Sequence, residues 1–188
     1  MPAPHPLFTA TRWLLRLAQA FCLFILAIMG LGIGAVLVGM TSLGASHLGI
    51  PASMDGVARN DALVIAALAL CGVLLSFALI LFIVRAVMAI VDTAISGDPF
   101  VNDNARRLTR IGTLLAILIM VELATNVTVN GLMKRLADLH HVPISAIGGF
   151  DFKPDISPIG LFTILLVFVL AQIFRRGSEM RAELEATV

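Results

Sequence analysis

The sequence predicts an all-α membrane protein with four transmembrane helices, and three observations support this fold class. Of the 188 residues, 59% are hydrophobic and 13% are charged, about half the charged share of a soluble domain. The mean hydropathy is +1.00, so the chain carries more apolar surface than a soluble domain of this size can bury. Four segments that are almost free of charge have lengths close to the roughly 20 residues that a helix needs to cross a bilayer. The composition also excludes a disordered chain, and two cysteines exclude a disulfide scaffold.

The first span is expected at about residues 14–39. No charged residue occurs between Leu17 and Met54, and small and polar residues from Thr41 onward predict a loop. Arg12 and Arg16 precede the apolar stretch, as basic residues do in a signal peptide. The stretch is longer than the roughly 7–15 residues of a signal-peptide core, so we expect a spanning helix rather than a cleaved leader.

The second span, at about 62–84, is predicted to belong to a helix that is longer than the membrane is thick. After Arg85 no helix breaker occurs before Gly97. A helix from Asp61 to Ser96 would be roughly 54 Å long at 1.5 Å per residue, whereas the hydrocarbon core is about 30 Å thick. Its last turns are therefore expected to extend beyond the membrane.

The third span, at about 111–133, is expected to begin as a helix near Asn102. Asparagine is a favourable N-cap residue, and Asp103 places negative charge in the first turn, where the helix dipole favours it. The second and third helices then extend into a helical hairpin, residues 85–110, with its turn at Gly97–Phe100.

The fourth span, at about 157–174, is followed by a polar tail, residues 175–188. The preceding segment contains strand-like pieces at 142–147 and 149–152, broken by glycine and proline. We expect small irregular or short-β loops there, and we expect residues 1–188 to form a single four-helix transmembrane domain.

The basic residues predict the orientation of the chain, because Lys and Arg accumulate in cytoplasmic loops. Nine of the 13 basic residues fall on one side of the predicted spans, and this side holds both termini and the hairpin. We therefore expect the termini and the hairpin to be cytoplasmic. The nine are Arg12, Arg16, Arg85, Arg106, Arg107, Arg110, Arg175, Arg176 and Arg181.

Glu122 is the one charged residue near the middle of a span. Asn126 and Asn130 follow four and eight residues later, so the three share one helical face. An ionised carboxylate in hydrocarbon is costly unless it is paired, hydrated or protonated, and we expect Glu122 to face the bundle interior. Two hypotheses remain open: a proton or cation site reached from outside, or a protonated Glu122 that hydrogen-bonds across the bundle and helps to fix helix packing.

Small residues in the first two spans predict close helix packing. Gly30 and Gly34 form a G-x-x-x-G pattern, which lets two backbones approach closely. The simplest interpretation is packing of the first helix against small residues of the second. A homodimer through Gly30 and Gly34 is the alternative. The small residues of the second span are Ala66, Ala69, Gly72 and Ser76.

The hairpin carries charges of both signs, which leaves two interpretations. Salt bridges between its arginines and Asp92 are the structural one, and a docking surface for a soluble partner is the functional one. The acidic residues are Asp92, Asp98 and Asp103, and the basic ones are Arg85, Arg106, Arg107 and Arg110.

No pattern of residues indicates catalysis. The chain contains no G-x-S-x-G, H-E-x-x-H, P-loop or glycine-rich dinucleotide motif. His47, His140 and His141 match no metal-binding spacing, and a net charge of +1 gives no reason to expect nucleic acid. We expect no enzyme activity, no cofactor, no metal and no direct contact with nucleic acid.

Two stretches, Val91–Gly112 and Leu170–Val188, resemble one bacterial family. They are similar to the motifs of the family called domain of unknown function 2975, whose members are small four-helix membrane proteins. Met180 and Ala186 stand where the tail motif usually has leucine. The residues that fit the hairpin motif are Gly97, Pro99, Phe100, Asn104, Ala105, Arg107, Leu108, Ile111 and Gly112, and those that fit the tail motif are Phe174, Arg175, Gly177, Glu183, Thr187 and Val188.

The resemblance implies a place in the bacterial cytoplasmic membrane but no activity. Family members often look like genomic neighbours of small helix-turn-helix regulators, which implies a cytoplasmic regulator as partner. We expect it to bind the hairpin and the tail, with Glu183 or Glu185 pairing with the arginines of the hairpin. The candidate residues of this surface are Asp92, Gly97, Pro99, Phe100, Asn104, Arg106, Arg107, Arg110, Arg175 and Glu183.

Two other functional hypotheses remain open. One is a small proton, ion or solute transporter, or a membrane stress or immunity protein, that uses Glu122. The other is a structural accessory subunit of a larger complex.

Overall fold

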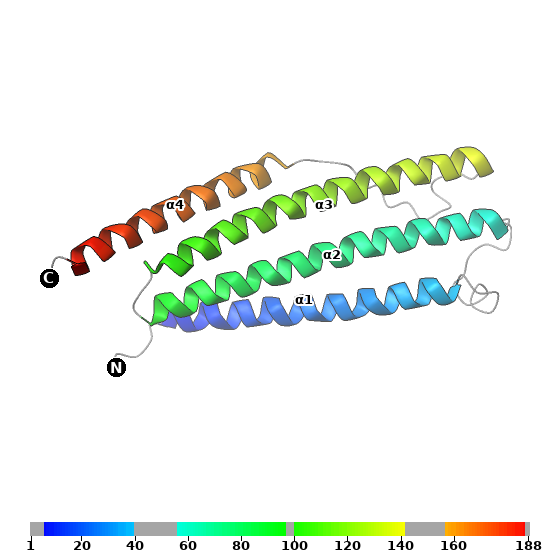
Figure 1. The fold of residues 1–188 in the computed structure, drawn as a ribbon. Helices are drawn as coiled ribbons and strands as arrows, with labels where there is room; N and C mark the ends of the chain where they lie inside the picture. Colours follow the sequence, from blue (N-terminus) through cyan, green and yellow to red (C-terminus); the bar gives the residue numbers. More distant parts are fainter. Residues whose placement is uncertain (1–5, 40–55, 97–99, 142–156, 187–188) are drawn as a thin grey trace. The chain divides into compact units, whose positions relative to one another are not determined.

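The computed structural model describes residues 6–39, 56–96, 100–141 and 157–186, and they form four α-helices (Figure 1). In chain order these are α1 (Pro6–Gly39), α2 (Gly56–Ile95), α3 (Asn102–His140) and α4 (Pro158–Ala186). No strand occurs among the described residues, and the predicted all-α class is confirmed. The strand-like pieces at 142–152 and the turn residues Gly97–Pro99 lie outside the described part of the chain.

Each helix is long and apolar enough to cross a membrane, which indicates a multi-pass membrane protein. The prediction of four such segments is confirmed. The candidate membrane-spanning segments are Thr9–Val38, Arg59–Ile95, Asn102–Leu139 and Pro158–Leu184.

Several helix boundaries agree with those predicted, whereas α1 begins at Pro6 and α2 at Gly56, both earlier than expected. α2 continues past Arg85 to Ile95 as one helix of 40 residues, because no glycine or proline interrupts it in that stretch. α3 begins at Asn102 with Asp103 in its first turn. α4 begins at Pro158, where proline fits the first helical turn because its missing N–H has no partner there.

The helices divide into two compact units, and three of the four helices contribute to both. The first unit comprises Met1–Phe24, Ala78–Ile119 and Ile156–Val188. The second comprises Ile25–Phe77 and Met120–Asp155.

In the first unit, α3 and α4 pack side by side in opposite directions. A Cβ built on Gly112 would lie 3.1 Å from the ring of Phe168, and one built on Gly160 would lie 3.2 Å from Ile119 Cδ1. The later residue of α3, Ile119, contacts the earlier residue of α4, Gly160. The two helices are therefore antiparallel, and the end of α4 lies beside the start of α3.

In the second unit, α2 packs closely on α3. Ile65 of α2 forms a buried cluster with Val129 and Leu136 of α3. A Cβ built on Gly72 would lie 2.4 Å from the side chain of Thr125, so this approach of the two helices requires glycine.

The predicted packing of α1 through Gly30 and Gly34 is wrong. Among the described residues, no atom lies within 4 Å of a Cβ built on either glycine, whereas Gly32 contacts Leu70 of α2. The turn between Gly30 and Gly34 therefore presents the intervening Gly32 to α2. Gly72, which was expected to face α1, contacts Thr125 of α3.

Candidate functional site

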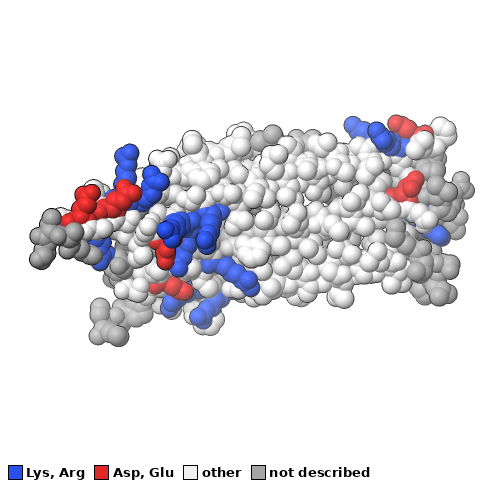
Figure 2. Space-filling model, in the orientation of Figure 1, with Lys and Arg blue, Asp and Glu red and all other residues white. Residues whose placement is uncertain are grey.

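Charged side chains of the first unit gather at one end of it, as Figure 2 shows. This end contains the start of α1, the end of α2, the start of α3 and the end of α4. We call it the polar end. It holds the residues of both family-like stretches that the structure describes.

An ion pair at the polar end joins α1 to α2. Arg12 Nε donates to Asp92 Oδ1 at 2.7 Å, and Nη2 contacts the same oxygen. Both side chains are half-exposed, at 42% and 47%. The prediction that Asp92 forms a salt bridge is confirmed, but its partner is Arg12 rather than an arginine of the hairpin. Arg12 lies far from Asp92 in the sequence, and no local spacing could have indicated this pair.

Asn104 is the polar centre of the joint between α2 and α3. Its side chain is 0% exposed, and its Nδ2 donates to Thr93 Oγ1 at 2.8 Å. The Thr93 hydroxyl in turn donates to the carbonyl of Ile90 at 2.8 Å. A buried amide is tolerated only when it is hydrogen-bonded, so Asn104 requires Thr93 opposite it.

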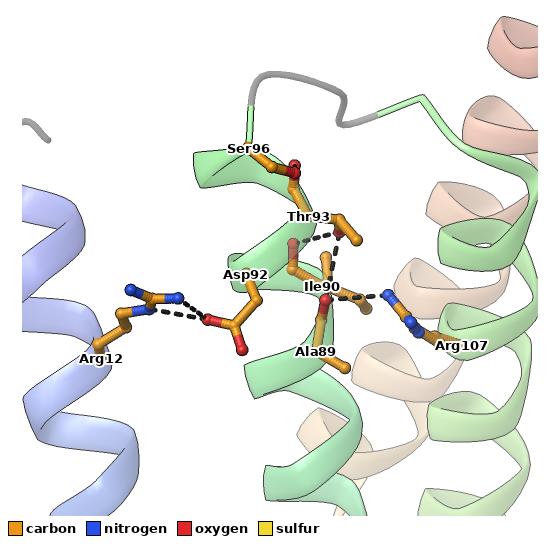
Figure 3. Close-up of polar contacts among 7 residues, drawn as sticks. All are labelled: Arg12, Ala89, Ile90, Asp92, Thr93, Ser96 and Arg107. Carbon is orange, nitrogen blue, oxygen red and sulfur yellow. Dashed lines mark hydrogen bonds and ion pairs between the residues drawn. The ribbon is translucent and has the colours of Figure 1, made fainter. Parts of the chain in front are cut away.

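Arg107 completes this joint. Its Nη1 donates to the carbonyl of Ala89 and to Asn104 Oδ1, both at 2.9 Å. A cation near the end of α2 also interacts favourably with the helix dipole. Figure 3 shows that Arg12 and Arg107 approach α2 from opposite sides, so the end of this helix is held by two neighbours.

The hairpin and the tail meet through aromatic packing. The rings of Phe100 and Phe174 have centroids 5.3 Å apart and are tilted by 35°. A Cβ built on Gly177 would lie 2.9 Å from Phe100 Cδ1. Three residues from the two family-like stretches therefore form one contact, which the charge pattern alone did not predict.

The remaining charged candidates lie at the surface. Arg106 lies 3.8 Å from Asp103, and Arg175 lies 3.7 Å from Glu179. All four side chains are more than 60% exposed. Arg110 and Glu183 are also exposed. The exposure of Arg106, Arg110 and Arg175 makes them accessible to other molecules, whereas Asn104 and Arg107 serve the joint itself.

Among the described residues, two grooves lie between the start of α3 and the end of α4. One, of about 450 Å³, is lined by residues 100–102 of the hairpin and by Arg175, Ser178, Glu179, Arg181 and Ala182 of the tail. We call it the tail groove. The other, of about 420 Å³, lies further along α3, and its walls include Arg106 and Arg175. We call it the arginine groove.

Glu122 does not face the bundle interior as predicted, because its side chain is exposed. In the second unit the packed face of α3 runs through Thr125, Val129 and Leu136. Glu122 lies about 60° around the helix from Thr125, at the flank of that face. Asn126 and Asn130 are half-buried and lie still further around the helix.

Four helices that are long and apolar enough to cross a membrane indicate that this chain is a multi-pass helical membrane protein. Its helices and motifs match a known family along nearly the whole length. The chain belongs to the family described as "Protein of unknown function (DUF2975)", whose model matches residues 5–188. Searches of curated proteins and of solved structures find no match.

Proposed function

We propose that this protein is a non-enzymatic component of the bacterial cytoplasmic membrane that binds a cytoplasmic regulator at its polar end. The supporting observation is that the hairpin motif and the tail motif lie against each other at the polar end. Phe100 of the first motif contacts Phe174 and Gly177 of the second. The charge distribution predicts that this end is cytoplasmic.

The tail groove is the docking position in this proposal. The contacts of Phe100 with Phe174 and Gly177 hold the segment that leads into α3 against the end of α4, and these contacts define the walls of the groove. Its rim carries Arg175, Arg181 and Glu179. A surface of mixed charge around a partly apolar groove suits a helix of a soluble protein. A helix-turn-helix regulator is the partner class implied by the resemblance to the family.

The test is co-purification, in mild detergent, with a helix-turn-helix regulator encoded beside the gene. Ala182→Trp fills the tail groove at an exposed position, and it should abolish binding of that regulator. Met180→Trp adds the same side chain to an exposed position of α4 that does not line the groove, and it should leave binding unchanged. Equal recovery of the regulator with both variants would contradict the proposal.

Transport through Glu122 has weaker support. A carboxylate that conducts ions through a single chain has to face its other helices or a water-filled cavity, and Glu122 is exposed on α3. Comparison of ion flux into proteoliposomes with the wild type and with Glu122→Gln tests this alternative. A flux that depends on Glu122 would favour transport over regulator binding.

A further inference from the structure

The arginine groove is amphipathic along its length. From the polar end inward it is lined by Arg106 and Arg175, then Thr109 and Gln172, then Phe168. Ala105 and Ala171 form its floor and are 4% and 5% exposed. These two small side chains leave the space of about 420 Å³ between the helices.

The two arginines supply the chemistry for binding an anion. They project from opposite walls, Arg106 from α3 and Arg175 from α4. Each guanidinium is permanently charged and carries five N–H donors in a fork that fits phosphate oxygens. Their distances to Asp103 and Glu179, 3.8 and 3.7 Å, exceed a hydrogen-bond length, so these exposed pairs hold the arginines only weakly.

The groove crosses the boundary between charged and apolar sequence. On α3 the charged residues end at Arg110, and a run of uncharged residues follows. On α4 the uncharged run ends at Phe174, directly before Arg175. The arginines therefore lie at the level of a membrane surface, and Phe168 lies at the level of the hydrocarbon.

We propose that the arginine groove binds the headgroup of an anionic phospholipid, with its phosphate between Arg106 and Arg175. Thr109 and Gln172 contact the glycerol region, and the upper part of one acyl chain lies on Phe168. Basic pockets between spanning helices are known to hold anionic lipid headgroups in this way. Free phosphate shares the headgroup chemistry but lacks the apolar part that Phe168 would contact.

The test is native mass spectrometry of the full chain in detergent, with phosphatidylglycerol and phosphatidylcholine offered at equal concentration. We expect the wild type to retain phosphatidylglycerol about tenfold more than phosphatidylcholine. Arg106→Gln with Arg175→Gln should remove this preference. Arg110→Gln is the matched control, because Arg110 is an exposed arginine of the same helix that does not line the groove, and it should keep the preference.

A second variant separates the groove from charge alone. Gln172→Trp keeps both arginines and fills the groove from an exposed position, and it should also remove the preference. An unchanged preference in this variant, or in the double arginine variant, would overturn the proposal. Inorganic phosphate is added as a competitor in the same experiment. If it displaces the bound lipid at the same concentration as added phosphatidylglycerol does, the lipid assignment is overturned in favour of a soluble phosphate.

Discussion

Phe100 lies against Gly177, and this contact joins the start of α3 to the end of α4. A Cβ on Gly177 would lie 2.9 Å from Phe100 Cδ1, closer than side chains normally approach. The Phe100 ring also packs on Phe174, so it cannot move away from Gly177 without losing a second contact. The position of the tail therefore depends on the absence of a side chain at residue 177.

Gly177→Leu is expected to destabilise the protein by about 1–3 kcal/mol, because the added side chain overpacks the contact with Phe100. Thermal unfolding in detergent measures this effect. Gly131→Leu is the control, because no described atom lies within 4 Å of a Cβ at Gly131. Phe100→Ala combined with Gly177→Leu should show a smaller penalty than the sum of the two single variants. Strictly additive penalties would mean that the two residues do not interact.

Asn104→Leu is expected to cost about 1–3 kcal/mol in the free energy of unfolding. Leucine leaves the Thr93 hydroxyl and one Arg107 donor without the buried amide that they now contact, and an unsatisfied buried polar group carries such a penalty. Thermal unfolding in detergent measures the loss. Arg110→Leu changes an exposed polar residue of the same helix and should cost much less. A similar loss for both variants would contradict the role assigned to Asn104.

The helices themselves could be predicted from the sequence because charge is scarce in it. Segments without charged residues mark the spans, and the absence of breakers between Arg85 and Gly97 predicts the long α2. Asn102 and Asp103 predict the start of α3. These are local signals, and each depends on only a few neighbouring residues.

The faces of the helices could not be predicted in the same way. A spanning helix is apolar both toward lipid and toward its neighbours, so its pattern does not separate the two sides. This ambiguity explains why Gly30 and Gly34 were expected to contact α2 and do not. Glu122 was expected inside the bundle because an ionised carboxylate is costly in hydrocarbon, but it is exposed. Partners distant in sequence, such as Arg12 and Asp92, require the structure.

The ion pair of Arg12 and Asp92 is expected to contribute about 0.2–1 kcal/mol, because both side chains are half-exposed. Asp92→Asn should lower the unfolding temperature slightly at low salt, and the difference from wild type should shrink as salt screens the pair. Exchanging the two residues, Arg12→Asp with Asp92→Arg, should recover most of the loss. A larger loss in the exchanged variant than in Asp92→Asn would contradict a simple ion pair.

Substitution by alanine is expected to have opposite effects on stability at Gly72 and Gly34. Gly72→Ala places a Cβ about where the Thr125 side chain now lies, at 2.4 Å, and it should destabilise the packing of α2 on α3 by about 1–3 kcal/mol. Gly34→Ala meets no described atom within 4 Å, and it should stabilise α1 slightly because alanine favours a helix over glycine. Thermal unfolding of both variants in detergent measures the contrast.

Substitutions on the face of α1 that carries Gly30 and Gly34 can test the homodimer that the sequence left open. Gly30→Leu with Gly34→Leu leaves the contacts within one chain intact, because neither glycine packs against a described residue. In a dimer that uses the G-x-x-x-G face, the leucines would hold the two backbones apart. The double variant should therefore be monomeric, by light scattering in detergent, under conditions in which the wild type is a dimer. A variant that dimerises as strongly as the wild type would exclude this face as the interface.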